Sequence, residues 1–237
     1  MLLLSAIICL MKRRILILDN NSIQPCGTCQ RFHYDIDWPY SVVHPFKGET
    51  LPDIKDYTHI ILTGGSGAYL HDGNPHLHKV LALIKSAHTK KVPLLGFCLG
   101  HELIAKALSR DNVIRPRSSA EIGWVRVHRI GESRLLASLP KTFYSFANHG
   151  NELIALPDGF RSIARTRRVD IAAYEHESHP TFGVQFHPEK TPTSALRTVW
   201  RRKKQHLPKR WFSHPYAMKS SYTPKISRQI FHNFYNQ

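Results

Sequence analysis

The segment Gly96-Phe97-Cys98-Leu99-Gly100 constrains the fold of this chain more than any other. It closes an apolar run at residues 92–97, which is typical of a buried strand. It leads without a gap into residues 99–108, where apolar residues recur at helical spacing. A strand that turns directly into a helix needs small residues around the turn, and glycines stand two positions before and two after the cysteine. The segment therefore predicts a sharp turn at the carboxyl end of a strand.

Two more apolar runs, at residues 15–18 and 59–63, end in a polar loop and a glycine-rich loop. Such runs are typical of parallel strands that are buried on both faces. Amphipathic helices are expected at 75–89 and 223–235, and shorter strands at 40–44, 122–129, 143–147, 161–165, 171–174 and 182–186. The expected fold class is α/β, with one domain, a mostly parallel central sheet flanked by helices, and extra short antiparallel strands in the C-terminal half.

Cys98 is the candidate nucleophile. It stands at the start of the helix at 99–108, where the helix dipole is expected to lower the thiol pKa from about 8.5 and to favour the thiolate. The Leu99 N–H faces the same spot and is suited to stabilise an oxyanion. The alternative is an unreactive core cysteine, the commonest fate of a free cysteine, but the flanking glycines favour the elbow.

A general base for this thiol is expected at the end of the last strand. There His187 is followed, past a proline, by Glu189. The imidazole can accept the thiol proton, and the carboxylate can orient the imidazole and stabilise its cationic form. The alternative is a surface turn with an incidental histidine, which has weight in a chain with 16 histidines.

The two motifs together resemble those of the class I (triad) glutamine amidotransferases, which adds a flavodoxin-like arrangement to the expected fold. Gly-x-Cys-Leu-Gly precedes the Gly-Val-Gln-Phe-His-Pro-Glu motif at 183–189 by about ninety residues. Residues 62–67 are similar to the oxyanion loop of the family. Residues 148–151 resemble the glutamine-contacting loop of the small subunit of carbamoyl-phosphate synthase, and 156–160 and 172–174 resemble the glutaminase part of GMP synthase. The resemblance covers roughly residues 12–193 and the final helix.

The resemblance implies a role for each matching residue. Cys98 would attack the side-chain amide of glutamine, the N–H groups of Gly65 and Leu99 would hold the oxyanion, and His187 and Glu189 would complete the triad. The residues that would seat glutamine are Gly67, Glu102, Asn148, Gly150 and Asn151. The ammonia would go to a synthetase on another chain, with GMP synthesis as the pathway that the resemblance suggests. No cofactor or metal is implied.

One position departs from the family pattern. Four residues after the nucleophile the family usually has glutamine, whereas this chain has Glu102. A carboxylate can only accept hydrogen bonds, so it suits a cationic α-amino group and would repel an α-carboxylate. A stand-alone γ-glutamyl-peptide hydrolase is therefore kept as an alternative, and so is a catalytically retired amidotransferase-like domain that acts as a basic binding module.

The positive charge of the chain is concentrated after the second motif. There are 33 Lys+Arg against 17 Asp+Glu, a formal net charge of +16, yet residues 190–237 hold 11 Lys/Arg and no acid. Residues 194–219 are interpreted as a basic insertion within a domain that spans 11–237. This segment is expected to be a solvated loop, or a docking surface for an acidic or nucleic-acid partner.

The remaining motifs carry weaker predictions. Residues 1–10 are expected to be a dispensable extension ahead of Met11, with a weak membrane anchor as the alternative. The apolar stretch at 1–11 is too short to span a bilayer. The few scattered cysteines fit a reducing cytoplasm, and the Cys26/Cys29 pair lacks the second pair of a structural zinc site. His71, Asp72, His76 and His78 are of metal-ligating types, but a polar loop at the start of a helix accounts for them better than a metal cluster does.

Overall fold

The computed structural model describes residues 13–21, 31–32, 38–214, 216 and 222–237. Residues 1–10, Cys26 and Cys29 lie outside the described residues, so what was expected of them stays a prediction. The helices are α2 (Leu77–Thr89), α3 (Leu99–Leu108), α4 (Pro192–Lys203) and α5 (Pro224–Tyr235). None of these described helices is both long and apolar enough to cross a membrane.

Five strands form the parallel part of a single sheet. In sheet order they are β2 (Tyr40–Val43), β1 (Ile15–Leu18), β3 (His59–Leu62), β4 (Leu94–Phe97) and β9 (Thr181–Val184). β4 and β9 are in register from Leu94 opposite Thr181 to Phe97 opposite Val184. The residues that follow these two strands therefore meet at one edge of the sheet, where α/β proteins bind their ligands.

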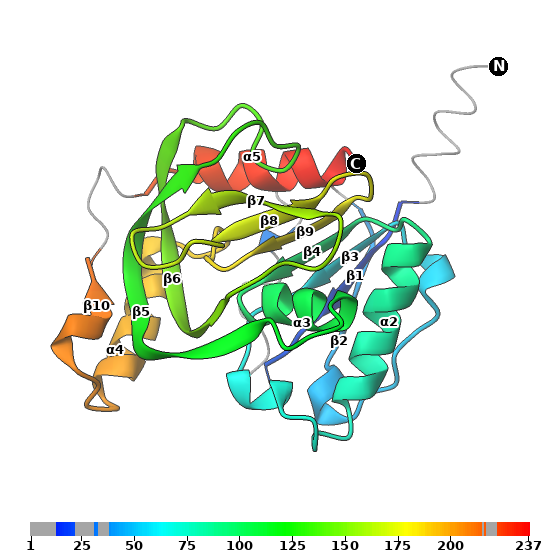
Figure 1. Ribbon diagram of the computed structural model, residues 1–237, viewed down its shortest axis with the longest axis horizontal. Coiled ribbons are helices and arrows are strands. Elements are labelled where there is room, and N and C mark those ends of the chain that lie inside the picture. The colour runs from blue at the N-terminus through cyan, green and yellow to red at the C-terminus, as the bar shows by residue number, and fades with distance from the viewer. Residues whose placement is uncertain (1–12, 22–30, 33–37, 215, 217–221) are drawn as a thin grey trace.

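The sheet continues beyond β9 with antiparallel strands. These are β8 (Ala173–His176), β7 (Phe160–Arg165), β5 (Ile114–Arg129) and β6 (Thr142–Leu153), which pairs with β5. The two-residue strand β10 (Phe212–Ser213) adds to the far side of β5 in parallel. Figure 1 shows α2 and α3 in front of the parallel strands, and α4 with β10 at the opposite end of the sheet, beside β5.

The parallel strands are buried on both faces because alternate residues enter two different cores. Ile15 and Ile17 pack into a cluster that includes Phe231 and Phe234 of α5. Their neighbours Leu16 and Leu18 pack into a second cluster with α2 and α3. All four of these strand residues have no exposed surface. This is why the strands read as unbroken apolar runs rather than as alternating ones.

The basic segment is folded where the structure describes it. Thr191 and Ser194 form a capping box at the start of α4, in which each side chain bonds the other residue's backbone N–H. Ala195 and Val199 on one face of α4 then pack against Trp124 of β5 in a third apolar cluster. The exposed face of the helix carries Arg197, Arg201, Lys203 and Trp200, which is 58% exposed.

The predicted fold class is confirmed, with differences in detail. The elements expected at 15–18, 59–63, 75–89, 99–108 and 223–235 are present with small shifts at their ends. β5 and β6 are much longer than the strands predicted at 122–129 and 143–147. The helix α4 was not predicted, because its mean polarity hides an apolar face of only a few residues.

Buried histidines predict that the fold loses stability in weak acid. Burial lowers the pKa of His59 and of His88 to about 4, and that of His101 to about 3. The charge of Arg13 further lowers the pKa of His59, and the charges of His179 and His176 further lower that of His88. The unfolded chain, with histidine pKa values near 6.5, therefore binds more protons than the folded one below that pH. The free energy of unfolding should fall as the pH drops from about 6.5 towards 4.

Urea unfolding at pH 7.5, 6.0 and 5.0 measures this slope. His88→Gln should flatten it, because a half-buried ring with a lowered pKa is removed. His78→Gln, at an exposed position of the same helix, is the matched control and should keep the wild-type slope. Equal slopes in wild type and His88→Gln would contradict the prediction that His88 contributes to the loss of stability in acid.

Candidate active site

Cys98 occupies a strained turn between β4 and α3. Its backbone has φ 50° and ψ −104°, a positive φ that residues with a side chain seldom adopt. The crossing of strand and helix leaves no room for side chains at the flanking glycines. A Cβ on Gly96 would lie 2.4 Å from the carbonyl of Gly100, and one on Gly100 would lie 2.3 Å from the carbonyl oxygen of Leu62. The predicted elbow is therefore present, and backbone packing holds it.

The structure brings His187 and Glu189 to this elbow. A Cβ built on Gly64, after β3, would lie 2.8 Å from Cε1 of His187 and 3.4 Å from Cβ of Cys98, so both side chains pack against the same glycine. Nδ1 of His187 lies 2.8 Å from Oε1 of Glu189. Within the described residues Nε2 of His187 is buried and has no hydrogen-bond partner, which leaves it available to the thiol.

The surroundings of Cys98 favour a neutral thiol at rest. Burial raises the pKa of Cys98 well above its usual range, and the Glu102 carboxylate raises it further. The Leu99 N–H and Arg202 act in the opposite direction but do not outweigh burial. The expected effect of the helix N-terminus, which favours the thiolate, is therefore opposed by burial, since Cys98 is only 5% exposed. Burial would also raise the pKa of Glu189, but the charge and hydrogen bond of His187 lower it overall.

The two residues expected to supply the oxyanion donors, Gly65 and Leu99, lie next to each other. The Leu99 N–H reaches the Cys98 sulfur and lowers the thiol pKa. Gly65 packs against Leu99, since a Cβ on it would lie 2.8 Å from the Leu99 side chain and 2.4 Å from the Asn20 carbonyl oxygen. Only glycine fits there. Gly67 begins the short 3-10 helix η4 (Gly67–Leu70), two residues further on.

Two of the expected substrate residues, Glu102 of α3 and Asn151 of β6, share a hydrogen-bond network. Asn148, Gly150 and Asn151 belong to strand β6 rather than to a loop. The Asn151 side-chain amide donates to Oε2 of Glu102 over 3.1 Å, and that of Gln185 donates to Oε1 over 3.3 Å. Burial raises the pKa of the Glu102 carboxyl, against the effect of the Asn151 hydrogen bond. Gly150 has open space beside its Cα.

Two residues join the site that the sequence did not single out. Arg202 of α4 donates from Nε to Oδ1 of Asn148 over 2.9 Å, and the backbone carbonyl of Asn148 lies 3.8 Å from the Cys98 sulfur. His149 supports the same strand through Nδ1, 2.8 Å from the Asn151 carbonyl, and Nε2, 3.3 Å from Glu121. Nothing in the sequence pattern separates Arg202 from the other basic residues at 201–204.

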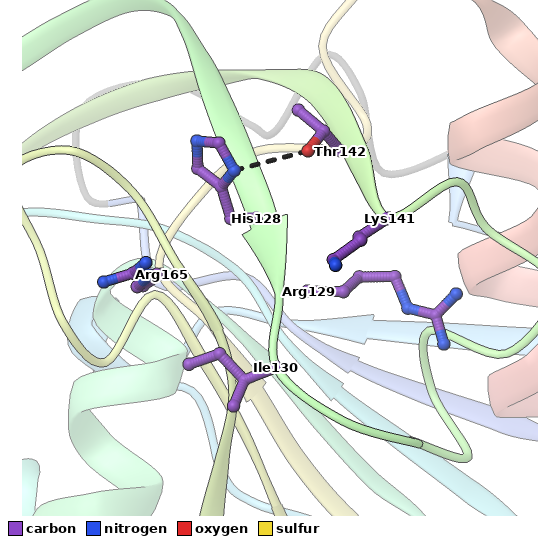
Figure 2. Close-up of a pocket in the computed structure, with 6 residues that line it drawn as sticks. All are labelled: His128, Arg129, Ile130, Lys141, Thr142 and Arg165. Carbon is purple, nitrogen blue, oxygen red and sulfur yellow. Dashed lines mark hydrogen bonds between the residues drawn. The ribbon is translucent and has the colours of Figure 1, made fainter.

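Two hollows of the surface lie away from these residues. Figure 2 shows one of about 430 Å³ at the end of the β5–β6 hairpin, where the side chains of Arg129, Lys141 and Arg165 are spread around it. A second, of about 720 Å³, adjoins it along β5 and shares His128 and Arg165 with it. None of the candidate site residues lines either hollow. Both are basic surface features apart from the thiol.

A cluster of three histidines also lies outside the site. His88, His176 and His179 offer ring nitrogens within 4.8 Å of one another, a spacing that a metal ion could bridge. However, two backbone N–H groups, of Ser178 and His179, donate to Nδ1 of His176. This places the proton of the neutral ring on Nε2, so a metal would have to displace the proton or both hydrogen bonds. The cluster is better explained as imidazole rings packed against one another.

An α/β sheet with a cysteine at a strand–helix elbow and a histidine–glutamate pair after the neighbouring strand defines the triad type of cysteine-dependent α/β enzyme. The family model for glutamine amidotransferase class-I matches residues 33–206. Because this match covers most of the chain, the protein belongs to the class I glutamine amidotransferase family. The family expected from the motifs is thereby confirmed.

Several relatives of the chain are named as glutamine-hydrolysing GMP synthases. The chain is 33% identical over 141 residues to a GMP synthase subunit of Methanocaldococcus jannaschii, a match that covers 60% of this chain and 69% of that one. It is 36% identical over 139 residues to the GMP synthase of Aspergillus fumigatus, covering 56% of this chain but only 24% of that protein. A glutamine amidotransferase structure from Thermotoga maritima matches 95% of this chain and 97% of its own length, with a TM-score of 0.78 at 22% identity.

The packing at the elbow predicts that a single added methyl group lowers the stability of the fold. Gly100→Ala should lower the free energy of unfolding by about 1–3 kcal/mol, because the added Cβ must push apart α3 and the backbone of β3. Thermal or urea unfolding measures the loss. Gly150→Ala is the matched control, since its Cβ meets nothing within 4 Å, and equal losses in the two variants would contradict the packing argument.

The raised pKa of the thiol predicts how Cys98 reacts with an uncharged alkylating agent. The rate of its modification by iodoacetamide should rise continuously from pH 7 to 9.5, because the thiolate fraction is still growing. Mass spectrometry of the peptide that contains Cys98 follows the reaction. Glu102→Gln should accelerate it at pH 7.5, since a neighbouring negative charge is removed. A rate that is already maximal at pH 6 would indicate a resting thiolate instead.

Proposed function

We propose that the protein hydrolyses the side-chain amide of glutamine to glutamate and ammonia, with Cys98, His187 and Glu189 as the catalytic residues. The observation that carries the proposal is their convergence: the thiol and the imidazole pack on the same glycine, and the carboxylate holds the other ring nitrogen. The family to which the chain belongs, and the names of its relatives, supply the amide substrate.

In the first step Nε2 of His187 takes the thiol proton as the sulfur attacks the amide carbon. The charge that develops on the amide oxygen is held by the N–H groups of Gly65 and Leu99. The tetrahedral intermediate then expels ammonia, which leaves with the proton from His187, and a thioester remains on Cys98. A neutral thiol at rest suits this sequence, since the proton is transferred only when the substrate is in place.

In the second step His187 takes a proton from water as the water attacks the thioester. The intermediate collapses, the proton passes to the sulfur, and glutamate leaves. Glu189 serves both steps by holding the Nδ1 proton and stabilising the imidazolium, which its lowered pKa equips it to do. Glu102, Asn148, Gly150, Asn151 and Gly67 are proposed to seat the substrate.

We further propose that the ammonia is used by a synthetase on another chain. The relatives from Methanocaldococcus jannaschii and Thermococcus kodakarensis are each named as one subunit of a glutamine-hydrolysing GMP synthase, which favours a partner subunit that aminates a nucleotide precursor. The basic, exposed face of α4 begins beside the candidate site and is a suitable surface for an acidic partner. A cytoplasmic location remains the expectation from the scattered cysteines.

Product analysis tests the reaction. The protein is incubated with glutamine or with a γ-glutamyl dipeptide, and released glutamate and ammonia are measured. Glutamate and ammonia should form in equal amounts from glutamine, and Cys98→Ala should reduce both below detection, because no other nucleophile forms the thioester. Cys98→Ala with an unaltered thermal unfolding curve excludes misfolding as the cause.

The same assay separates the alternatives. Turnover of the dipeptide but not of glutamine would replace the proposal with a γ-glutamyl-peptide hydrolase. No turnover of either substrate, alone or with an archaeal GMP synthetase subunit added, would favour a retired domain that acts through its basic surface.

A further inference from the structure

Arg202 carries a charge that the described part of the chain leaves without a carboxylate. Its hydrogen bonds go to two neutral groups, Oδ1 of Asn148 through Nε and Oε1 of Gln205 through Nη1. No Asp or Glu oxygen in the described ranges lies within salt-bridge distance of it, whereas Arg115, Arg117 and Arg161 each pair with one. A partly buried guanidinium without a counter-ion is costly, so its position calls for an anion.

The position of Arg202 is beside the candidate nucleophile. Asn148 links the two, because its side chain accepts the Arg202 hydrogen bond while its backbone carbonyl faces the Cys98 sulfur. The two residues also interact electrostatically, the guanidinium lowering the thiol pKa. Its Nη2 makes no hydrogen bond to any residue that the structure describes. The guanidinium is thus fixed at one end and has donors left for a ligand.

We propose that Arg202 binds the α-carboxylate of the amino-acid substrate and so sets the specificity of the site. The inference rests on the proposed function and names a residue for the end of the substrate that does not react. The bond from Nε to Asn148 and the fork-shaped guanidinium suit a planar carboxylate. The helix that supplies Arg202 belongs to the basic segment that follows the triad motif.

Glu102 supplies the complementary charge. Its carboxylate interacts with the Cys98 thiol, as Arg202 does, but with opposite sign. Each of its oxygens accepts one hydrogen bond, from Asn151 or Gln185, which leaves a lone pair on each for an ammonium group. A carboxylate and a guanidinium near the same sulfur match the two charges on the α-carbon of glutamine. The repulsion that Glu102 would exert on the α-carboxylate is thereby offset by Arg202.

Binding to the inactive Cys98→Ala protein tests the assignment without chemistry. The probes are glutamine, glutaramic acid, which lacks the α-amino group, and 4-aminobutanamide, which lacks the α-carboxylate. In titration calorimetry, Arg202→Ala should weaken the binding of glutamine and of glutaramic acid roughly 10- to 100-fold. This is the range for the loss of a hydrogen bond to a charged group. The same variant should bind 4-aminobutanamide with unchanged affinity. Arg202→Lys should restore part of the loss, because it keeps the charge but not the fork.

Two further variants complete the design. Glu102→Gln should weaken the binding of glutamine and of 4-aminobutanamide, but not the binding of glutaramic acid. Arg201→Ala, next along α4 and exposed, should bind all three probes like the Cys98→Ala parent.

An equal loss of affinity for all three probes in Arg202→Ala would mean that Arg202 only supports the position of Asn148, and it would overturn the proposal. Unchanged glutamine binding in that variant would overturn it as well. If the Cys98→Ala parent binds no glutamine while binding a γ-glutamyl dipeptide, the proposed function fails, and the dipeptide then replaces glutamine in the same comparison of variants.

Discussion

The close contact of backbone with backbone where α3 crosses the parallel sheet is the constraint on which the rest of this site depends. Gly96 meets the carbonyl of Gly100, and Gly100 meets the carbonyl of Leu62, at distances that exclude a side chain at either glycine. Only this approach lets the chain turn from strand to helix within one residue. The positive φ of Cys98 is the strain that results, and the surrounding core holds it in place.

The other site residues are positioned by the same sheet edge. β4 and β9 are in register, so Cys98 and His187 follow neighbouring strands at the same end. The hydrogen bond between His187 and Glu189 then needs only the short turn that the intervening proline stiffens. Burial raises the pKa of the Cys98 thiol. In the proposed mechanism the thiol proton therefore passes to His187 as the sulfur attacks the substrate.

The antiparallel half of the sheet supplies what surrounds the thiol. β6 carries Asn148 and Asn151 past the elbow, and α4 packs on β5 so that Arg202 reaches the same place. This arrangement makes the basic segment part of the site as well as a surface. Under the two proposals the charge of the chain would be used in two ways: one guanidinium would bind the substrate carboxylate, and the neighbouring exposed cations would face a partner.

The motifs and periodicities were sufficient to predict the α/β class, the elbow at Cys98, and His187 and Glu189 as its partners, because each depends on residues close together in the chain or on strand ends that a parallel sheet brings to one edge. The sequence did not determine the state of the thiol, which depends on burial by distant elements, nor the helix at 192–203, whose apolar face is too small to recognise. It could not distinguish Arg202 from Arg201 or Lys203. Only the tertiary structure decided which of these side chains turns towards Asn148, because that depends on how α4 packs against β5, a contact between residues more than seventy positions apart.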